Sequence, residues 1–416
     1  MTEKINKHIY ILLVSFIPFS IIIGSALSLI NILLISVIAI FLIILSKKRY
    51  FFKNTEILIF ITIFIYLLFN TYISIDYNYS LTRNFGFLRF ILFFIALNYF
   101  FYKIKDFDKF FTFWIIVIFT IIFDSYIEFI FGQNLLGFGD EKHVYIDRIV
   151  SFFKDEPIVG GFLNGFFFLI LGYLFKYNYF KKYNYLICFI VVSLFLICIF
   201  ITGERSNTIK AVIGLSIFFI LNKEFKFKHK IFLMISFFII AFLLISSSSY
   251  LKNRYIDNII SPILKADTRE KFLEDNIYFK HYRSGYAVFK NYPIFGVGNK
   301  NYRIETRNNQ FTKEKYIPDT HPHQVYFEFL SEHGIIGTFI LLSSFLFLIF
   351  KNIKICLISK NYLQLGAFAF LITNFLPIVP SGSFFSDFNI TIFFINLSIY
   401  YACNPDSNIF KERLSY

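Results

Sequence analysis

The sequence predicts an all-α protein that crosses a membrane many times. Hydrophobic residues make up 57% of the 416 residues and charged residues only 16%, with a mean hydropathy of +0.62. Phenylalanine occurs 63 times and tyrosine 28 times. Apolar runs of about 17–25 residues, the length at which a helix spans a bilayer, recur along the chain. Soluble domains do not carry so many long apolar runs, so the predicted fold class is a polytopic helical membrane protein.

The apolar runs predict about twelve transmembrane helices. The first run is expected to stay in the protein as a helix, because the sequence shows no cleavable signal peptide. Pro377, Pro380 and Gly382 are expected to end or kink the eleventh helix. The expected spans are residues 8–25, 27–46, 57–74, 85–102, 110–130, 158–175, 185–202, 207–222, 231–249, 335–350, 362–380 and 387–402.

Charge predicts how these helices are oriented. One set of segments holds 21 Lys and Arg against 7 Asp and Glu, a net charge of +14, and the rest of the chain holds 20 of each. Because the excess of Lys and Arg marks cytoplasmic loops, both termini are expected in the cytoplasm. Basic charge confined to short connections also argues against nucleic acid as a partner. The basic set is the N-terminus, 47–53 with Glu56, 103–109, 176–184, 223–230, 351–360 and the C-terminus.

This topology divides the chain into three parts. Residues 1–249 carry nine helices with short loops, residues 250–334 form one large external loop domain, and residues 335–416 carry the last three helices and the cytoplasmic C-terminus. The four cysteines fall in helices or cytoplasmic segments, so neither a disulfide nor a cysteine-based metal site is predicted. These are Cys188, Cys198, Cys356 and Cys403.

A histidine motif precedes the tenth expected helix. His321 and His323 flank Pro322, and Gln324 is followed after nine residues by Gly334-x-x-Gly337. A histidine near neutral pKa at a membrane surface suits removal of a proton from a hydroxyl group. The residues alone also allow a structural role, in which the imidazole has its hydrogen bonds satisfied at the membrane interface and takes no part in catalysis.

A metal site at these histidines is the weaker alternative. The nearby Asp319 and Glu328 could complete a site with His321 and His323, but the proline between the histidines gives no helical ligand pair. His333, at the end of the motif, is expected to be structural.

Three arginines are candidates for binding a phosphorylated substrate on the external face. Arg205 lies in the short turn 203–207 between the seventh and eighth helices. Arg283 precedes Pro293-x-x-Gly296-x-Gly298, whose amides could face an anion. Arg148 belongs to a first external loop, 132–157. Guanidinium groups bind phosphates through paired hydrogen bonds. The alternatives are headgroup contact or pairing with Glu204 for Arg205, a surface salt bridge for Arg283, and pairing with Asp147 or Asp155 for Arg148.

Taken together, these motifs resemble the O-antigen ligase family. The family's motifs are a Thr-x-Ser-Arg turn, an Arg…Asn-Pro-Leu-Phe-Gly-x-Gly segment and the histidine motif. Here Thr202-Gly203-Glu204-Arg205 departs from the first by its Glu. The resemblance implies a membrane glycosyltransferase (GT-C-like) fold with one large periplasmic loop, in the bacterial inner membrane. It also implies transfer of a glycan from undecaprenyl diphosphate to lipid A–core, a step of lipopolysaccharide biosynthesis.

The resemblance also implies roles for individual residues. His323 would be the general base, and Arg205, Arg283 and Arg148 would bind the diphosphate. The supporting residues would be His321, Gln324, Gly334 and Gly337. No cofactor and no metal is expected, and the partners would be the lipid-linked donor, the glycan acceptor and membrane lipids.

Other activities share this chemistry or this fold class. An O-antigen polymerase or an O-linked protein oligosaccharyltransferase would differ only in its acceptor. A polysaccharide transporter is less favoured, because the expected spans are largely free of charge and the charged groups lie on the external face.

Overall fold

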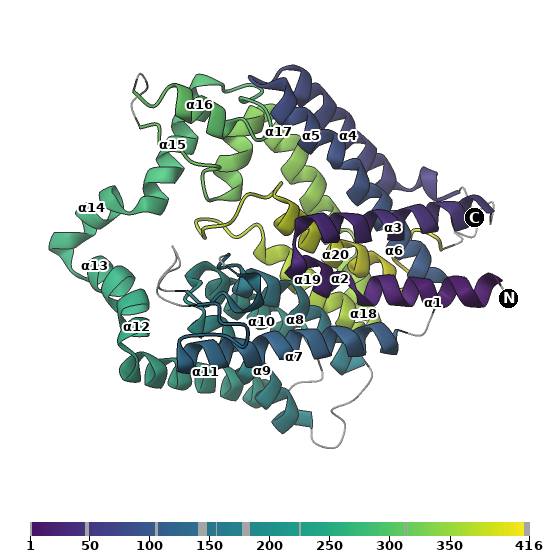
Figure 1. The fold of residues 1–416 in the computed structure, drawn as a ribbon, viewed down its shortest axis with the longest axis horizontal. Coiled ribbons are helices and arrows are strands. Elements are labelled where there is room, and N and C mark those ends of the chain that lie inside the picture. Colours follow the sequence, from purple (N-terminus) through teal and green to yellow (C-terminus); the bar gives the residue numbers. More distant parts are fainter. Residues whose placement is uncertain are drawn as a thin grey trace. The chain divides into compact units, whose positions relative to one another are not determined.

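The computed structural model is helical throughout the part of the chain that it describes, residues 2–45, 50–104, 107–139, 148–154, 156–176, 184–223, 226–311, 313 and 315–411 (Figure 1). The all-α prediction is thereby confirmed. Contacts group the chain into two compact units, each made of three stretches of sequence. The three-part division of the chain given above remains a prediction. Of the first external loop, Asp140, Glu141, His143, Asp147 and Asp155 lie outside the described residues.

Unit 1 comprises Met1–Ile35, Lys103–Lys265 and Lys354–Thr373. Its helices are α1 (Thr2–Ser15), α2 (Ile17–Ile23), α7 (Asp108–Phe131), η2 (Ser151–Phe153), α8 (Val159–Lys176), α9 (Asn184–Ile201), α10 (Arg205–Leu221), α11 (Phe227–Ser247), α12 (Ser249–Leu251), the π-helix η3 (Lys252–Ile260), α13 (Ser261–Leu264), α18 (Ile353–Ser359) and α19 (Tyr362–Thr373). Helix α3 (Ser25–Leu45) runs from unit 1 into unit 2.

Unit 2 comprises Ser36–Tyr102, Ala266–Ile353 and Asn374–Tyr416. Its helices are η1 (Tyr50–Lys53), α4 (Thr55–Tyr72), α5 (Tyr77–Gly86), α6 (Leu88–Lys103), α14 (Ala266–Asp275), α15 (Ile277–Asn291), α16 (Tyr302–Asn308), α17 (Val325–Phe350) and α20 (Asp387–Ala402). The histidine motif and Arg283 therefore belong to unit 2, whereas Arg148 and Arg205 belong to unit 1.

Each predicted span coincides with helix over most of its length, and the chain is a membrane protein. Within the described residues, six stretches are long and apolar enough to cross a bilayer. The predicted number of about twelve remains a prediction. The six are Ser25–Ile44, Thr55–Tyr72, Tyr77–Lys103, Asp108–Phe131, Phe227–Ser247 and Val325–Ser359; Val159–Phe175, Leu186–Ile201 and Tyr362–Thr373 are apolar but shorter.

Two predicted boundaries were wrong. The tenth helix begins at Val325, ten residues before the expected start, because a helical segment precedes the Gly334 break. The eleventh ends at Thr373 and does not reach residue 380. Pro377 explains the second difference, because proline has no amide hydrogen and disfavours helical backbone in the residue before it.

Close backbone packing holds α8 against α19 inside unit 1. A Cβ atom added at Gly172 would lie 2.3 Å from the carbonyl oxygen of Tyr362, and one at Gly366 would lie 2.0 Å from that of Phe168. Such contacts require glycine, and small residues are the usual means by which membrane helices approach closely.

A kink in α17 is locked to the loop that follows α15. Gly334 has φ 62° and ψ −168°, a conformation that essentially only glycine adopts. The loop pairs with both sides of the kink: Val297 N donates to Ser331 O (3.0 Å) and Ile335 N donates to Pro293 O (2.8 Å). The Gly296-x-Gly298 and Gly334-x-x-Gly337 patterns therefore serve one structural purpose, the mutual fit of the loop and the kinked helix.

Replacing Gly334 with alanine is expected to destabilise unit 2 strongly. The added Cβ would lie 2.4 Å from the carbonyl of Ile294, and the backbone conformation alone costs a non-glycine residue about 1–3 kcal/mol. The melting temperature of the detergent-solubilised protein measures this effect. Gly86→Ala is the matched control: its Cβ would meet only the Arg89 side chain, at 3.5 Å, so its melting temperature should stay near that of the parent. Equal stability of the two variants would contradict the packing described here.

Candidate active site

His323 is placed at the mouth of α17 by its neighbour. Gln324 is the N-cap residue of this helix, and its side-chain oxygen accepts hydrogen bonds from Tyr326 N (2.7 Å) and Phe327 N (3.2 Å). These bonds satisfy amides that have no partner inside the helix. His323 itself has φ 56°, a left-handed conformation in which histidine is enriched among non-glycine residues. Its carbonyl accepts a hydrogen bond from Ser381 N at 2.8 Å.

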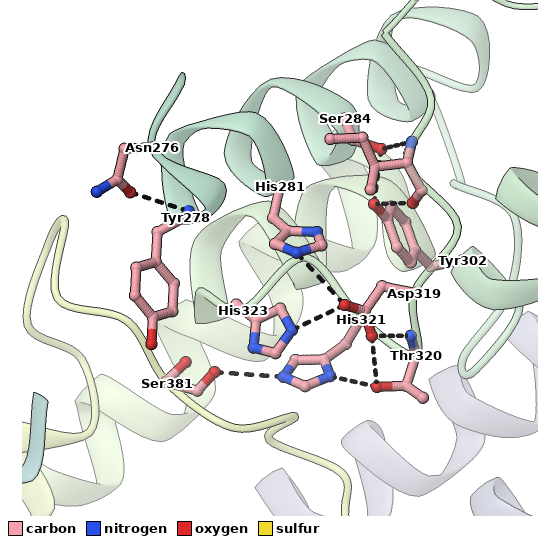
Figure 2. A network of polar contacts seen from close by, with 11 residues as sticks. Asn276, Tyr278, His281, Ser284, Tyr302, Asp319, Thr320, His321, His323 and Ser381 are labelled. Carbon is pink, nitrogen blue, oxygen red and sulfur yellow. Dashed lines mark hydrogen bonds and ion pairs between the residues drawn. The ribbon is translucent and has the colours of Figure 1, made fainter. Parts of the chain in front are cut away.

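Three side chains from separate segments meet at Asp319 (Figure 2). The Oδ2 atom of Asp319 lies 3.1 Å from Nε2 of His323 and 3.4 Å from Nε2 of His281. His281 comes from α15, Asp319 from the loop before Pro322, and His323 from the start of α17. The His281 side chain is 6% exposed, whereas that of His323 is 30% exposed. Of the two imidazoles, His323 is therefore the one that a substrate can reach.

Asp319 fixes the protonation pattern of His323. Although burial opposes it, hydrogen bonds from His323 and from the amide of Thr320 hold the pKa of Asp319 far below its usual range. Asp319 is thus a carboxylate at neutral pH and can only accept hydrogen bonds. In a neutral His323, Nε2 then carries the proton, and Nδ1 keeps a lone pair that accepts no hydrogen bond from the described residues. Burial and the nearby His323 also lower the pKa of His281.

His321 is held in place by contacts of its ring nitrogens with neighbouring residues. Its Nδ1 lies 2.8 Å from the hydroxyl of Thr320 and its Nε2 lies 3.3 Å from the carbonyl of Ser381, so both ring nitrogens are engaged. Burial, together with the charges of His323 and Lys300, lowers the pKa of His321 to about 3. This imidazole is neutral at physiological pH and supports the loop that carries His323.

The burial of His321 predicts how the free energy of unfolding depends on pH. The pKa of His321 is lower in the folded protein than the value of about 6.5 in an unfolded chain, so the unfolded state binds more protons. Its contribution to stability is complete above about pH 6.5 and is lost as the pH falls towards 3. Between pH 7 and pH 5 the free energy of unfolding should fall by about 2 kcal/mol from this group. Thermal melting at both pH values measures the change, and in His321→Gln it should shrink; an undiminished change would contradict the assignment.

Arg283 lines an open cavity in unit 2. The cavity has a volume of about 490 Å³, and its wall is mainly aromatic. Arg283 is exposed and donates a hydrogen bond to the carbonyl of Leu273. Gln324, the residue next to His323, also faces this cavity. The full lining is Phe279, Tyr282, Arg283, Tyr286, Gln324, Tyr326, Phe327, Pro377 and Ile378.

The amides of the glycine loop after α15 are not available to an anion. Gly296 N donates to Tyr292 O (3.1 Å), Gly298 N to Glu332 O (2.9 Å) and Asn299 N to the side chain of Asn70 (2.8 Å). The suggestion that these amides face an anion is therefore wrong.

The expected ligands of a histidine metal site were also partly wrong. Glu328 accepts hydrogen bonds from Ser383 Oγ (2.5 Å) and Phe384 N (2.9 Å), so it anchors the loop before α20 and does not face His323. His321 is engaged by Thr320 and Ser381. The cluster that forms instead contains His281, which sequence reasoning missed because 42 residues separate it from His323.

Arg205 is the first residue of α10 in unit 1. Its guanidinium donates to the carbonyl of Arg254 at 3.3 Å. Glu204, the departure from the family's turn, is directed elsewhere: its carboxylate accepts from Gly160 N (2.6 Å) and from the Asn207 side chain (2.6 Å). Burial raises the pKa of Glu204 to about 7. Glu204 is therefore a buried brace for the turn, and the partners of its carboxylate are Gly160 and Asn207.

Arg148 lies within the predicted first external loop, in the same unit. Its backbone is held nearby by Glu128, whose carboxylate accepts hydrogen bonds from Val150 N (2.9 Å) and Ser151 N (2.6 Å). The charge of Arg148 also lowers the pKa of Glu204, which places these two side chains near each other. Unit 1 thus brings Arg148 close to the turn that carries Arg205.

His333, Gly334 and Gly337 are parts of the packed helix. His333 is fully buried, and its Nδ1 lies 3.3 Å from the hydroxyl of Tyr66. A Cβ atom at Gly337 would lie 1.7 Å from the same hydroxyl. Both glycines are buried in α17, so their support for the site consists of shaping this helix.

Comparison with known proteins identifies one matching family. Residues 190–342 match the family described as O-antigen ligase. The matched region contains Arg205, Arg283 and His323, and Arg148 lies outside it. Enzymes of this family are ligases and polymerases that transfer lipid-linked glycans. No curated protein matches the chain.

Proposed function

Because residues 190–342 match the O-antigen ligase family, whose members transfer lipid-linked glycans, we propose that this chain moves a glycan from undecaprenyl diphosphate to lipid A–core. The reaction takes place on the periplasmic face of the inner membrane. The observation that carries the proposal is the hydrogen bond between Asp319 and His323 Nε2. It leaves the lone pair on Nδ1 of a neutral, partly exposed imidazole available at the start of a helix.

His323 is the general base in this mechanism. The acceptor hydroxyl attacks the anomeric carbon of the donor, and its proton passes to Nδ1 of His323. The bond between the anomeric carbon and the diphosphate oxygen breaks, and the diphosphate keeps the electron pair. One direct displacement inverts the anomeric centre. The Asp319 carboxylate stabilises the imidazolium that forms, the function that a carboxylate serves in other acid–base dyads. General-base assistance of this kind is worth about 10²–10⁴ in rate.

Arginine side chains stabilise the leaving diphosphate. Negative charge grows on it as the glycosidic bond breaks, and fixed guanidinium groups lower the energy of that state without reorganising. Arg283, beside the aromatic cavity, and Arg205, in the braced turn of unit 1, are the two principal candidates. Arg148 is the third.

The aromatic cavity suits the lipid portion of the donor. Its wall of Phe, Tyr, Pro and Ile side chains removes apolar surface from water, while Arg283 supplies one positive charge at its margin. A prenyl chain attached to a diphosphate has this same combination of a long apolar body and a charged end.

Reconstitution with separate acceptors tests the function. Purified protein in liposomes is given an undecaprenyl-diphosphate glycan together with lipid A–core, a second lipid-linked glycan or an acceptor protein. Product on lipid A–core supports the ligase. Elongated lipid-linked glycan identifies a polymerase, and glycosylated protein identifies an oligosaccharyltransferase; either result would replace the acceptor in the proposal. Absence of transfer to all three would contradict the function as a whole.

A further inference from the structure

The cluster of His281, Asp319 and His323 has the geometry of a three-ligand cation site. The three ligand atoms, two Nε2 and one Oδ2, all lie within 4.8 Å of one another. Ligands of a tetrahedral Zn²⁺ ion, at about 2.0–2.1 Å from the metal, stand roughly 3.4 Å apart. The two distances to Asp319, 3.4 Å and 3.1 Å, match that spacing. Figure 2 shows both imidazoles directed at the same carboxylate.

The three ligands lie on segments that are already fixed. His281 is held on α15, which packs on α17, and its ring is nearly fully buried. The Nδ1 atom of His281 is buried and has no hydrogen-bond partner among the described residues. The ring contacts Asp319 through Nε2. Asp319 and His323 lie four positions apart in the sequence, in the loop that contains Pro322. Little rearrangement is needed to bring the three atoms to metal-binding distance.

We propose that these three side chains bind a Zn²⁺-class cation and that the bound cation stops glycan transfer. Two imidazoles and one carboxylate, with a fourth position open, form a ligand set that suits Zn²⁺ and its neighbours in the first transition series. Mg²⁺ and Ca²⁺ prefer sites built from oxygen atoms alone, so neither ion is expected to bind at the proposed site.

Inhibition follows from the chemistry of imidazole. A neutral imidazole that binds a metal through Nε2 carries its proton on Nδ1. His323 then has no lone pair with which to accept the proton of the acceptor hydroxyl. Metal binding also removes the hydrogen bond from His323 to Asp319. This consequence rests on the proposed function of His323, whereas the binding itself does not.

Binding is tested first, without any activity measurement. Isothermal titration of the purified, metal-free protein with Zn²⁺ should show one site, and titration with Mg²⁺ should show none. Loss of one ligand in His281→Ala should weaken Zn²⁺ binding by more than about 100-fold, beyond the loss typical of outer-shell changes. Co²⁺ gives an independent reading, because its visible spectrum reports tetrahedral coordination in the parent protein. Equal Zn²⁺ affinity in His281→Ala and the parent, or Co²⁺ with an octahedral spectrum in the parent, would overturn the site.

Activity then tests the consequence. Transfer should be undiminished by EDTA and should fall on addition of Zn²⁺ at concentrations that saturate the site. In His281→Ala, or His281→Gln where alanine impairs folding, the fraction of transfer that Zn²⁺ inhibits should be much smaller than in the parent. Transfer that EDTA abolishes and Zn²⁺ restores would overturn the inhibitory role. Failure of the general-base role itself appears separately, as undiminished transfer in His323→Ala, and leaves the binding result intact.

Discussion

Replacing His323 with alanine is expected to lower the rate of glycan transfer by about 10²–10⁴-fold, the usual worth of general-base assistance. The side chain is 30% exposed, so its loss opens no large void in the core and the protein should remain folded in the membrane. Single-turnover transfer from a lipid-linked donor measures the rate. Added imidazole should restore part of it, because a free base can occupy the vacated space. An unchanged rate would refute the general-base role.

Asp319→Asn tests whether Asp319 acts by fixing the tautomer of His323. The amide group of asparagine can donate a hydrogen bond to Nε2 of His323 and would place the proton on Nδ1, so the base would present the wrong tautomer. An equivalent exchange in serine proteases lowers kcat by about 10⁴. We expect a loss close to that of His323→Ala, with imidazole rescue absent because the ring still fills its place. Full activity in Asp319→Asn would show that His323 does not depend on this carboxylate.

Replacing Arg205 with lysine is expected to cost about 10²–10³ in transfer rate, the effect of removing one fixed donor to a developing negative charge. Lysine keeps the positive charge but not the planar fork that binds a diphosphate through two hydrogen bonds. The effect should appear in the rate at saturating donor, because the interaction strengthens as the leaving group gains charge.

Glu204→Gln is the matched control in the same turn. Its side chain still accepts the hydrogen bond from Gly160 N, and Glu204 is directed to Gly160 and Asn207 rather than to Arg205. Activity near that of the parent is therefore expected. Equal losses in both variants would mean that the turn, and not the guanidinium, is required.

The helices could be predicted from the sequence because long apolar runs have few other outcomes in a membrane protein. Each of the twelve runs became helix over most of its length. The errors occurred where tertiary contacts override local pattern. Val325–Phe350 contains a break at Gly334 that the loop around Pro293 holds in place, and a run of apolar residues does not reveal such a pairing.

The candidate site was predictable in part for a related reason. The spacing from His323 to Gly337 is a local signal, and it placed His323 before the tenth helix, although the predicted start of that helix was ten residues too late. His281 carries no such signal, since it occurs on a different helix and its partner Asp319 is distant in sequence. Gln324 was expected only to support the site, and its use as the N-cap of α17 depends on backbone geometry that the sequence does not display.

Binding of the donor's diphosphate by Arg205 and Arg283 is the claim on which the mechanism depends, and protection of engineered cysteines tests it directly. The single variants Arg205→Cys and Arg283→Cys are each treated with a monofunctional methanethiosulfonate, with and without a lipid diphosphate, and the labelled fraction is measured by mass spectrometry. Background is low, because all four native cysteines are buried. We predict that the lipid diphosphate suppresses labelling at both positions. Labelling that the lipid diphosphate leaves unchanged at either position would contradict the role of that arginine in binding the diphosphate.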